Sequence, residues 1–335
     1  MSSMQYPLSL LWATPLVAFL GYASHRASLC TVRAVGDVLE SRRFERFGGF
    51  LRAMLWAMLL TLPALLLMPS LYAAPTPTAP LWLGLGGGFL FGLGAALNGG
   101  CSFSTLQRLA DADWRMLATL AGFIIGVAAW QLAPPLFTLN SQPGHPSPAW
   151  LMAALALLVI WAGVEIRALW PHRRGLRERL GADAYSPRAT AVLLGLGAGA
   201  LYLGFGPWTY TYTLRGSVSA LAGDPVAPPA TQLLLVPVLL LGMMISAWRR
   251  GAWHKARPAT GWPLNLGGGL LMGLGGALIP GGNDTLLLRL IPTLTPHSLW
   301  IYLMLVAGVA GGLLLKRAAL NPAPAARRPD DDRSC

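Results

Sequence analysis

The chain has 335 residues, of which 54% are hydrophobic and only 11% are charged, and it carries 39 glycines and 27 prolines. Soluble domains carry about 25% charged residues, so this composition excludes an ordinary soluble globular enzyme. The net charge of +12 does not indicate nucleic acid binding, because the basic residues are nearly all arginine and lie in short connections between apolar runs. We therefore expect a protein that crosses a membrane several times.

Nine apolar runs are each long enough to cross a bilayer, for which about 20 residues suffice. The first run has no basic segment before it and continues into further apolar chain, so it is predicted to be a span and not a cleaved signal peptide. The predicted spans are residues 8–23, 50–71, 80–97, 116–132, 148–169, 189–206, 230–248, 264–279 and 298–315. The sequence thus predicts an all-α polytopic membrane protein.

Basic residues concentrate in alternate connections between these spans. The first, third, fifth and seventh connections are basic, whereas the even-numbered ones are rich in proline and carry only Arg215 and Arg289. Because positively charged connections stay in the cytoplasm, this alternation predicts an N-terminus outside and a C-terminus inside. The tail is predicted to be disordered, and its Cys335 is interpreted as incidental.

One segment of the chain occurs twice. Residues 85–97, LGGGFLFGLGAAL, recur at 266–278 as LGGGLLMGLGGAL, and a break follows each copy, NGGC in the first and IPGGN in the second. The charge pattern gives the copies opposite orientations, which predicts two inverted repeats with interrupted helices, as in many transporters. Close helix packing is an alternative interpretation of the glycines, but it does not explain the matched breaks. The predicted divisions are a first repeat at 1–147, a linking span and basic loop at 148–188, an inverted second repeat at 189–316 and the tail at 317–335.

Two cysteines lie at predicted breaks. Cys101 ends the segment NGGC, and Ser102 or Ser104 is predicted to cap the next helix and leave its N–H groups directed at the thiol. Cys30 lies between Arg26 and Arg33. A buried cysteine is often only a small hydrophobic residue, but two at helix breaks favour a functional role. The cysteine and histidine spacings are not those of a disulfide framework or a metal site, so we expect no metal and no cofactor.

Two segments resemble a known family. GYASHRASLC, at 21–30, and GAALNGGC, at 94–101, are similar to the first two signature segments of the YeeE/YedE family, bacterial inner-membrane proteins that take up thiosulfate or related sulfur compounds. The resemblance covers all nine spans, and it implies an hourglass-like bundle of nine membrane-spanning helices plus short helices. It also implies a path lined by three cysteines, of which Cys30 and Cys101 match two. The third follows a Gly–Gly pair in the second half, where this chain has Asn283.

A sulfur oxyanion that enters a bilayer needs hydrogen-bond donors, because its uncompensated transfer costs on the order of tens of kcal/mol. Thiols suit a terminal sulfur, whereas N–H groups and arginine suit the oxygens. Asp284 would repel an anion unless it is paired, for which Arg289 is a candidate, or it serves as a proton site. The aromatic residues Trp208, Tyr210 and Tyr212 are interpreted as an interfacial belt, and lining the outer vestibule is the alternative. The predicted substrate-binding residues are Cys30, Cys101, Asn283, Gly100, Gly282, Ser102, Arg26, Arg33 and Asp284.

We predict an inner-membrane permease for a small sulfur-containing anion, without enzymatic activity. One alternative is a membrane thiol enzyme or sulfurtransferase partner, with Cys101 as a nucleophile activated by a helix N-terminus and by Arg108. Against it, no histidine, acid or second cysteine adjoins either thiol in sequence. Another alternative is a membrane subunit of a sulfur-handling complex. A soluble cytoplasmic sulfur-carrier protein is a candidate partner for the basic inner face at 173–188 and 249–257.

Overall fold

A computed structural model of the chain describes residues 5–68, 77–78, 80–132, 140–141, 148–169, 184–206, 208–221, 228–255, 261–279, 281–295 and 297–320. The helices in chain order are α1 (Gln5–Ala27), α2 (Thr31–Ser41), α3 (Glu45–Leu67), α5 (Leu81–Asn98), α6 (Ser102–Ala110), α7 (Arg115–Leu132), α8 (Pro148–Leu169), α10 (Pro187–Phe205), α11 (Tyr210–Leu221), α12 (Ala230–Arg249), the 3-10 helix η2 (Ala252–Lys255), α13 (Trp262–Leu278), α14 (Asn283–Thr285), the π-helical turn η3 (Leu286–Leu290) and α15 (Ser298–Leu320). Two short strands, β1 (Pro77–Thr78) and β2 (Asn140–Ser141), pair antiparallel.

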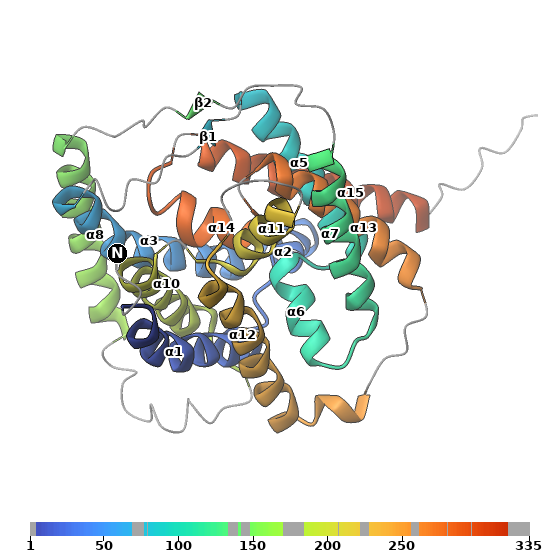
Figure 1. Cartoon of the computed structure of the whole chain (residues 1–335), viewed down its shortest axis with the longest axis horizontal. Helices are drawn as coiled ribbons and strands as arrows, with labels where there is room; N and C mark the ends of the chain where they lie inside the picture. Colours follow the sequence, from blue (N-terminus) through green and yellow to red (C-terminus); the bar gives the residue numbers. More distant parts are fainter. Residues whose placement is uncertain are drawn as a thin grey trace, which may run out of the picture.

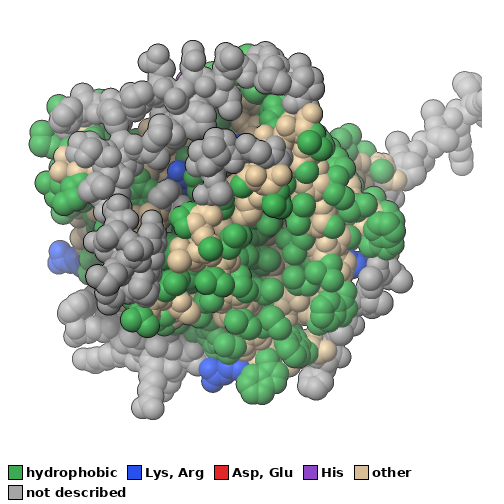
Figure 2. Space-filling view, in the orientation of Figure 1, with side chains coloured by type: hydrophobic (Ala, Val, Ile, Leu, Met, Phe, Trp, Pro, Cys, Tyr) green, Lys and Arg blue, Asp and Glu red, His purple; other side chains and the backbone are tan. Residues whose placement is uncertain are grey.

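Eight helices in the described part of the chain are long and apolar enough to cross a membrane, which confirms an all-α polytopic membrane protein. They coincide with the predicted second to ninth spans. The predicted first span lies within α1, which is 23 residues long but is not among the eight, so that span stays a prediction. Hydrophobic side chains cover most of the described surface in Figure 2. On α8, Leu157 and Ile160 are 69% and 65% exposed, as expected of side chains that face lipid.

The long helices form two groups, and each group combines helices from both halves of the chain. In one group α3 packs against α10, and α1 packs against α12 and α10. In the other group α13 packs against α5 and α7, and α5 packs against α15. The short helices α2, α6, α11 and α14 lie between the two groups (Figure 1). The polar breaks of the chain are therefore brought to the centre of the molecule.

These packing partners relate the two halves of the chain. We match α1 with α10, α3 with α12, α5 with α13 and α7 with α15. Exchanging the members of every match converts each of these contacts either into another of them or, for α1 with α10 and α5 with α13, into itself. An internal two-fold relation has this property. The packing therefore supports the two predicted repeats, with α8 outside the matched set, while their boundaries stay a prediction.

The repeated glycines allow close helix packing. Gly92 of α5 and Gly273 of α13 occupy equivalent positions in the two copies of the repeated segment. A Cβ atom added at Gly92 would overlap the carbonyl oxygen of Leu305, and one added at Gly273 would overlap that of Phe123. These glycines therefore allow close helix packing, which was the alternative interpretation. Both copies of the repeated segment allow it in the same way.

We expect Gly92→Ala to lower stability by about 1–3 kcal/mol, because α15 must move to admit the added methyl group. Gly86→Ala is the matched control, since Gly86 lies in the same helix and a Cβ atom there meets no atom within 4 Å. Thermal unfolding of both variants in detergent measures the difference. Equal midpoints would show that α5 and α15 are not packed as closely as described.

Candidate functional site

The first break lies between α5 and α6. Gly99 ends α5 with a φ of 73°, in the left-handed region that favours glycine. Cys101 is then the N-cap residue of α6, and Cys30 is the N-cap residue of α2. The predicted cap was wrong: Ser102 is the first residue inside α6 and its buried hydroxyl oxygen has no partner among the described residues. Each thiol nevertheless lies at a helix N-terminus, which was predicted for Cys101.

The two thiols lie against each other in the protein interior. Cys30 and Cys101 are 2% and 1% exposed, and both are free. The Cys30 thiol lies beside the Cys101 thiol, donates to the Ser104 hydroxyl at 3.3 Å, and faces the backbone amides of Cys101 and Arg33. The Cys101 thiol faces the backbone amides of Ser104 and Thr31. The N-termini of α2 and α6 thus converge on one pair of thiols, which we call the thiol pair.

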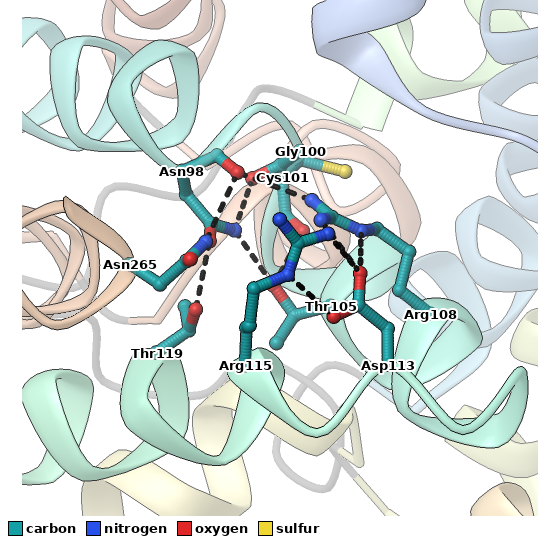
Figure 3. A network of polar contacts seen from close by, with 9 residues as sticks. All are labelled: Asn98, Gly100, Cys101, Thr105, Arg108, Asp113, Arg115, Thr119 and Asn265. Atoms are coloured by element: carbon teal, nitrogen blue, oxygen red, sulfur yellow. Dashed lines mark hydrogen bonds and ion pairs between the residues drawn. The ribbon is translucent and has the colours of Figure 1, made fainter. Parts of the chain in front are cut away.

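Asn98 holds the first break in shape (Figure 3). Its side-chain nitrogen donates to the Gly100 carbonyl at 2.9 Å and to the Thr105 hydroxyl at 3.1 Å. Its side-chain oxygen accepts from Thr119 at 2.7 Å and from Asn265 at 2.8 Å. Because Thr119 and Asn265 belong to α7 and α13, Asn98 ties the break to both neighbouring helices. Gly100 therefore has a structural role beside the thiol pair.

Arg108 secures the same break from the other side. Its NH1 group donates to the Asn98 carbonyl at 3.1 Å, and its Nε and NH2 groups donate to Asp113 at 3.2 and 2.8 Å. Arg115 also binds Asp113, with two bonds of 2.8 Å. Although burial opposes it, these bonds hold the pKa of Asp113 below its usual value. All three guanidinium nitrogens of Arg108 are thus engaged, so the predicted activation of Cys101 by Arg108 finds no support.

The second break precedes α14. Asp284 accepts hydrogen bonds from the Thr211 hydroxyl and, at 3.2 Å, from the Thr211 backbone N–H, so its carboxylate lies at the N-terminus of α11. The Thr211 hydroxyl also accepts from the Gly282 N–H at 2.8 Å and lies 3.0 Å from the Thr285 hydroxyl. Asp284 is therefore bound to α11 and not to Arg289, which was the predicted partner. Gly282 contributes its backbone to this break.

Tyr210 links the two breaks. It is 4% exposed, and its hydroxyl donates to the Ser102 carbonyl at 2.7 Å. Its ring lies near both the Asp284 carboxyl and the Cys101 thiol. The interpretation of Tyr210 as part of an interfacial belt was therefore wrong, because the fold buries this residue between the breaks. Periodicity within the short segment 208–212 carried no signal for that placement.

Two pockets adjoin these breaks. One is polar, reaches Cys30, and is lined by His25, Ser28, Arg33, Gly99, Ser104, Gln107, Arg108, Asp111 and Arg250. The other is apolar except at Asn283 and Asp284, and is also lined by Leu29, Phe50, Ala53, Phe103, Leu194, Leu287 and Leu288. Asn283 is 3% exposed, and its side-chain oxygen has no partner among the described residues. Since buried polar atoms are normally bonded, this acceptor oxygen leaves room for a hydrogen-bond donor such as water.

The arginines near Cys30 have different surroundings. Arg33 lines the polar pocket, as a substrate-binding role requires. Arg26 is buried instead against Ser246, to which its Nε donates at 3.2 Å, and the Tyr22 ring, whose centroid lies 5.1 Å from its guanidinium carbon. It lines neither pocket, so the structure does not bring Arg26 to the thiol pair.

His25 was not predicted as a site residue. It lines the polar pocket, 2% exposed, with its ring nitrogens 3.0 Å from the Ser246 hydroxyl and 3.1 Å from the Asp111 carboxylate. A histidine five residues before Cys30 was the available signal, but its partners belong to α12 and to the residue that follows α6. Only the tertiary structure brings them together.

The fold and these breaks define a multi-pass membrane protein with a polar centre, and comparison places it in a family. The family described as sulphur transport matches residues 26–311, and the chain belongs to it. The chain is also similar to the thiosulfate transporter TsuA of Escherichia coli (strain K12), with 26% identity over 197 residues that cover 48% of this chain and 55% of that protein. The chain thus matches about half the length of this curated relative. The predicted family is confirmed.

Proposed function

We propose that this protein is a permease of the bacterial inner membrane that admits a small sulfur-containing anion, thiosulfate or a related sulfur species. The observation that carries this proposal is the thiol pair, which lies at two converging helix N-termini between the two helix groups. Membership of a sulphur transport family supports the class of cargo. The name of the relative, which describes a thiosulfate transporter, supports thiosulfate as the first substrate to test.

The thiol pair suits both ends of such an anion. Sulfur is polarisable, so the Cys30 and Cys101 thiols match a terminal sulfur atom. Unbonded N–H groups and the partial positive charge of the α2 and α6 N-termini match the anionic oxygens. The Ser102 hydroxyl, which is buried without a partner among the described residues, adds a donor beside them. These groups offset the cost of removing the anion from water without any covalent step.

The order of sites along the path follows from the charge pattern. With the N-terminus outside, the second break lies toward the outer side and the thiol pair toward the cytoplasm. The anion would then pass from the apolar pocket at Asn283 to the thiol pair and leave through the polar pocket that Arg33 and Arg250 line. At the second break the amide of Asn283 stands where the family resemblance places a third thiol, and it still donates two N–H bonds.

A membrane thiol enzyme is the second candidate, because the fold supplies the neighbouring thiol that the sequence around each cysteine lacks. Attack by one thiol on the outer sulfur of thiosulfate would form a persulfide on the protein and release sulfite, and the thiol proton would pass to the persulfide. Attack by the second thiol on the protein-bound sulfur of the persulfide would break its S–S bond, form a Cys30–Cys101 disulfide and release hydrosulfide. Mass spectrometry after exposure to thiosulfate decides this point: a persulfide on Cys101 would favour the enzyme, and its absence during active uptake favours the permease.

A soluble sulfur-carrier protein remains a proposed cytoplasmic partner. Arg249 and Arg250 belong to the basic inner face that would bind it, while residues 173–183 and 256–257 of that face lie outside the described part of the chain. An acidic carrier is the expected chemistry, because opposite charge speeds association.

Uptake of radiolabelled thiosulfate into cells that lack other sulfur importers tests the permease. We expect uptake by the wild-type chain above the empty-vector level, and equal or greater uptake by Asn283→Cys, because the substitution restores the third thiol. Uptake by Asn283→Cys alone would mean that this permease is selective for a different sulfur species. No uptake by either chain, with both present in the membrane, would reject thiosulfate as the cargo.

A further inference from the structure

Arg289 is a buried cation that the thiol pair does not use. It lies in η3, at the end of the apolar segment Trp262–Leu290, and it is 7% exposed. Its guanidinium carbon lies 4.1 Å from the centroid of the Tyr212 ring. Its NH1 group is buried and has no hydrogen-bond partner among the described residues. Within the described residues, Arg289 therefore has an unused donor and no carboxylate bound to it.

Several other arginines of the described chain are paired with carboxylates. Arg52 binds Glu165 at 3.0 Å, and Arg115 binds Asp113 at 2.8 Å. Arg289 has no such ion pair within the described residues, and the nearby carboxylate of Asp284 is occupied by Thr211. A buried charge without a counter-ion is costly, and an aromatic ring offsets only part of that cost. The missing counter-ion is therefore an anion that the described part of the chain does not supply.

The position of Arg289 suits a ligand. Tyr212 directly follows Thr211, which holds the second break, and Arg289 lies six residues after Asn283 on the same segment. The segment forms a π-helical turn, with the Ile291 N–H bonded to the Leu286 carbonyl at 3.0 Å. Such turns occur frequently at functional sites. Arg289 and Tyr212 thus lie beside the second break, on the side that the charge pattern assigns to the exterior.

We propose that Arg289 and the ring of Tyr212 form an anion-capture site, separate from the thiol pair, that takes a small tetrahedral oxyanion such as thiosulfate. The planar guanidinium would donate to two oxygens of the anion while its face stays against the ring. The identity of the ligand rests on the proposed function. A water molecule would satisfy the NH1 donor but not the charge, whereas an oxyanion satisfies both.

Capture at this site would raise the local concentration of the anion before it reaches the thiol pair. We expect Arg289→Gln to raise the thiosulfate concentration for half-maximal uptake about tenfold or more, which corresponds to the loss of one hydrogen bond to a charged group. The maximal rate should change less than about twofold, because the thiol pair is untouched. Arg317→Gln is the matched control, since Arg317 is 41% exposed and binds Glu40.

A binding measurement separates this site from transport. Purified full-length Cys101→Ala, which lacks one thiol, is heated with sodium thiosulfate or with sodium chloride of equal ionic strength. We expect thiosulfate to raise the unfolding midpoint, because a ligand that binds the folded state stabilises it. Adding Arg289→Gln should remove that increase. If the glutamine variant does not fold, Arg289→Lys is used instead. Lysine keeps the charge but not the planar pair of guanidinium donors, so it should reduce the thiosulfate-induced increase in the unfolding midpoint.

The outcomes distinguish the two proposals. An Arg289-dependent rise in the midpoint without uptake by the wild-type chain would support the capture site and reject the permease. If wild type and Arg289→Gln take up thiosulfate with the same half-saturating concentration, the capture site is rejected and the permease proposal is retained. Arg289→Lys replaces Arg289→Gln in this comparison if only the lysine variant folds. An equal rise in the midpoint with and without Arg289 would also reject it.

Discussion

Replacing Cys101 by alanine is expected to reduce thiosulfate uptake to the empty-vector level. The substitution removes the thiol that faces Cys30 at the N-terminus of α6, while the backbone that Asn98 and Arg108 hold stays in place. Alanine fits the site because Cys101 makes no side-chain capping bond that its helix would lose. Since the helix N-termini and Arg33 remain and only the polarisable sulfur of Cys101 is lost, the substitution should reduce uptake without impairing folding.

Two further variants make this test specific. Cys101→Ser keeps a hydroxyl donor, so uptake that is weak but above background would show that polarity alone gives part of the function. Cys335→Ala, in the predicted tail, should take up thiosulfate like the wild-type chain. The membrane content of each variant is measured by immunoblot alongside the uptake. Wild-type uptake by Cys101→Ala would exclude the thiol pair from the path.

Replacing Thr211 by valine is expected to destabilise the protein by about 3 kcal/mol, because a buried carboxylate loses a hydrogen-bond donor. The Thr211 hydroxyl donates to Asp284 and also accepts from the Gly282 N–H, so valine removes this acceptor from the Gly282 N–H and leaves the Asp284 carboxylate with the backbone N–H of residue 211 but no hydroxyl donor. Valine has nearly the shape of threonine, so the packing of α11 should not change. The second break should then loosen, and uptake should fall with it.

Thr213→Val is the matched control for this prediction. Thr213 lies in the same helix and is fully buried, but its hydroxyl oxygen has no partner among the described residues. Replacing it should be neutral or stabilising, because an unpaired hydroxyl is exchanged for a methyl group. Thermal unfolding of the two purified variants in detergent gives the comparison. Equal midpoints would mean that the bonds of Thr211 do not hold the second break.

The sequence by itself determined the class of protein, the positions of the long helices and the two breaks. Hydropathy and run length are local properties, so apolar runs such as 50–71 and 298–315 predicted α3 and α15 without knowledge of their neighbours. The Gly–Gly pairs marked the breaks for a local reason too, since Gly99 and Gly281 adopt positive φ angles of 73° and 129°. The repeated segment was recognisable in the sequence because both copies need glycines at the same positions to pack closely against neighbouring helices.

Only the tertiary structure decided which side chains meet. Cys30 and Ser104 are 74 residues apart in the chain, yet they are bonded beside Cys101. Tyr210 was expected at an interface and is instead buried against the Ser102 carbonyl, and Arg108 was expected to activate a thiol and instead holds a break. Contacts of this kind depend on how helices distant in sequence pack around the centre. The residue periodicity within a single helix does not predict such contacts between helices.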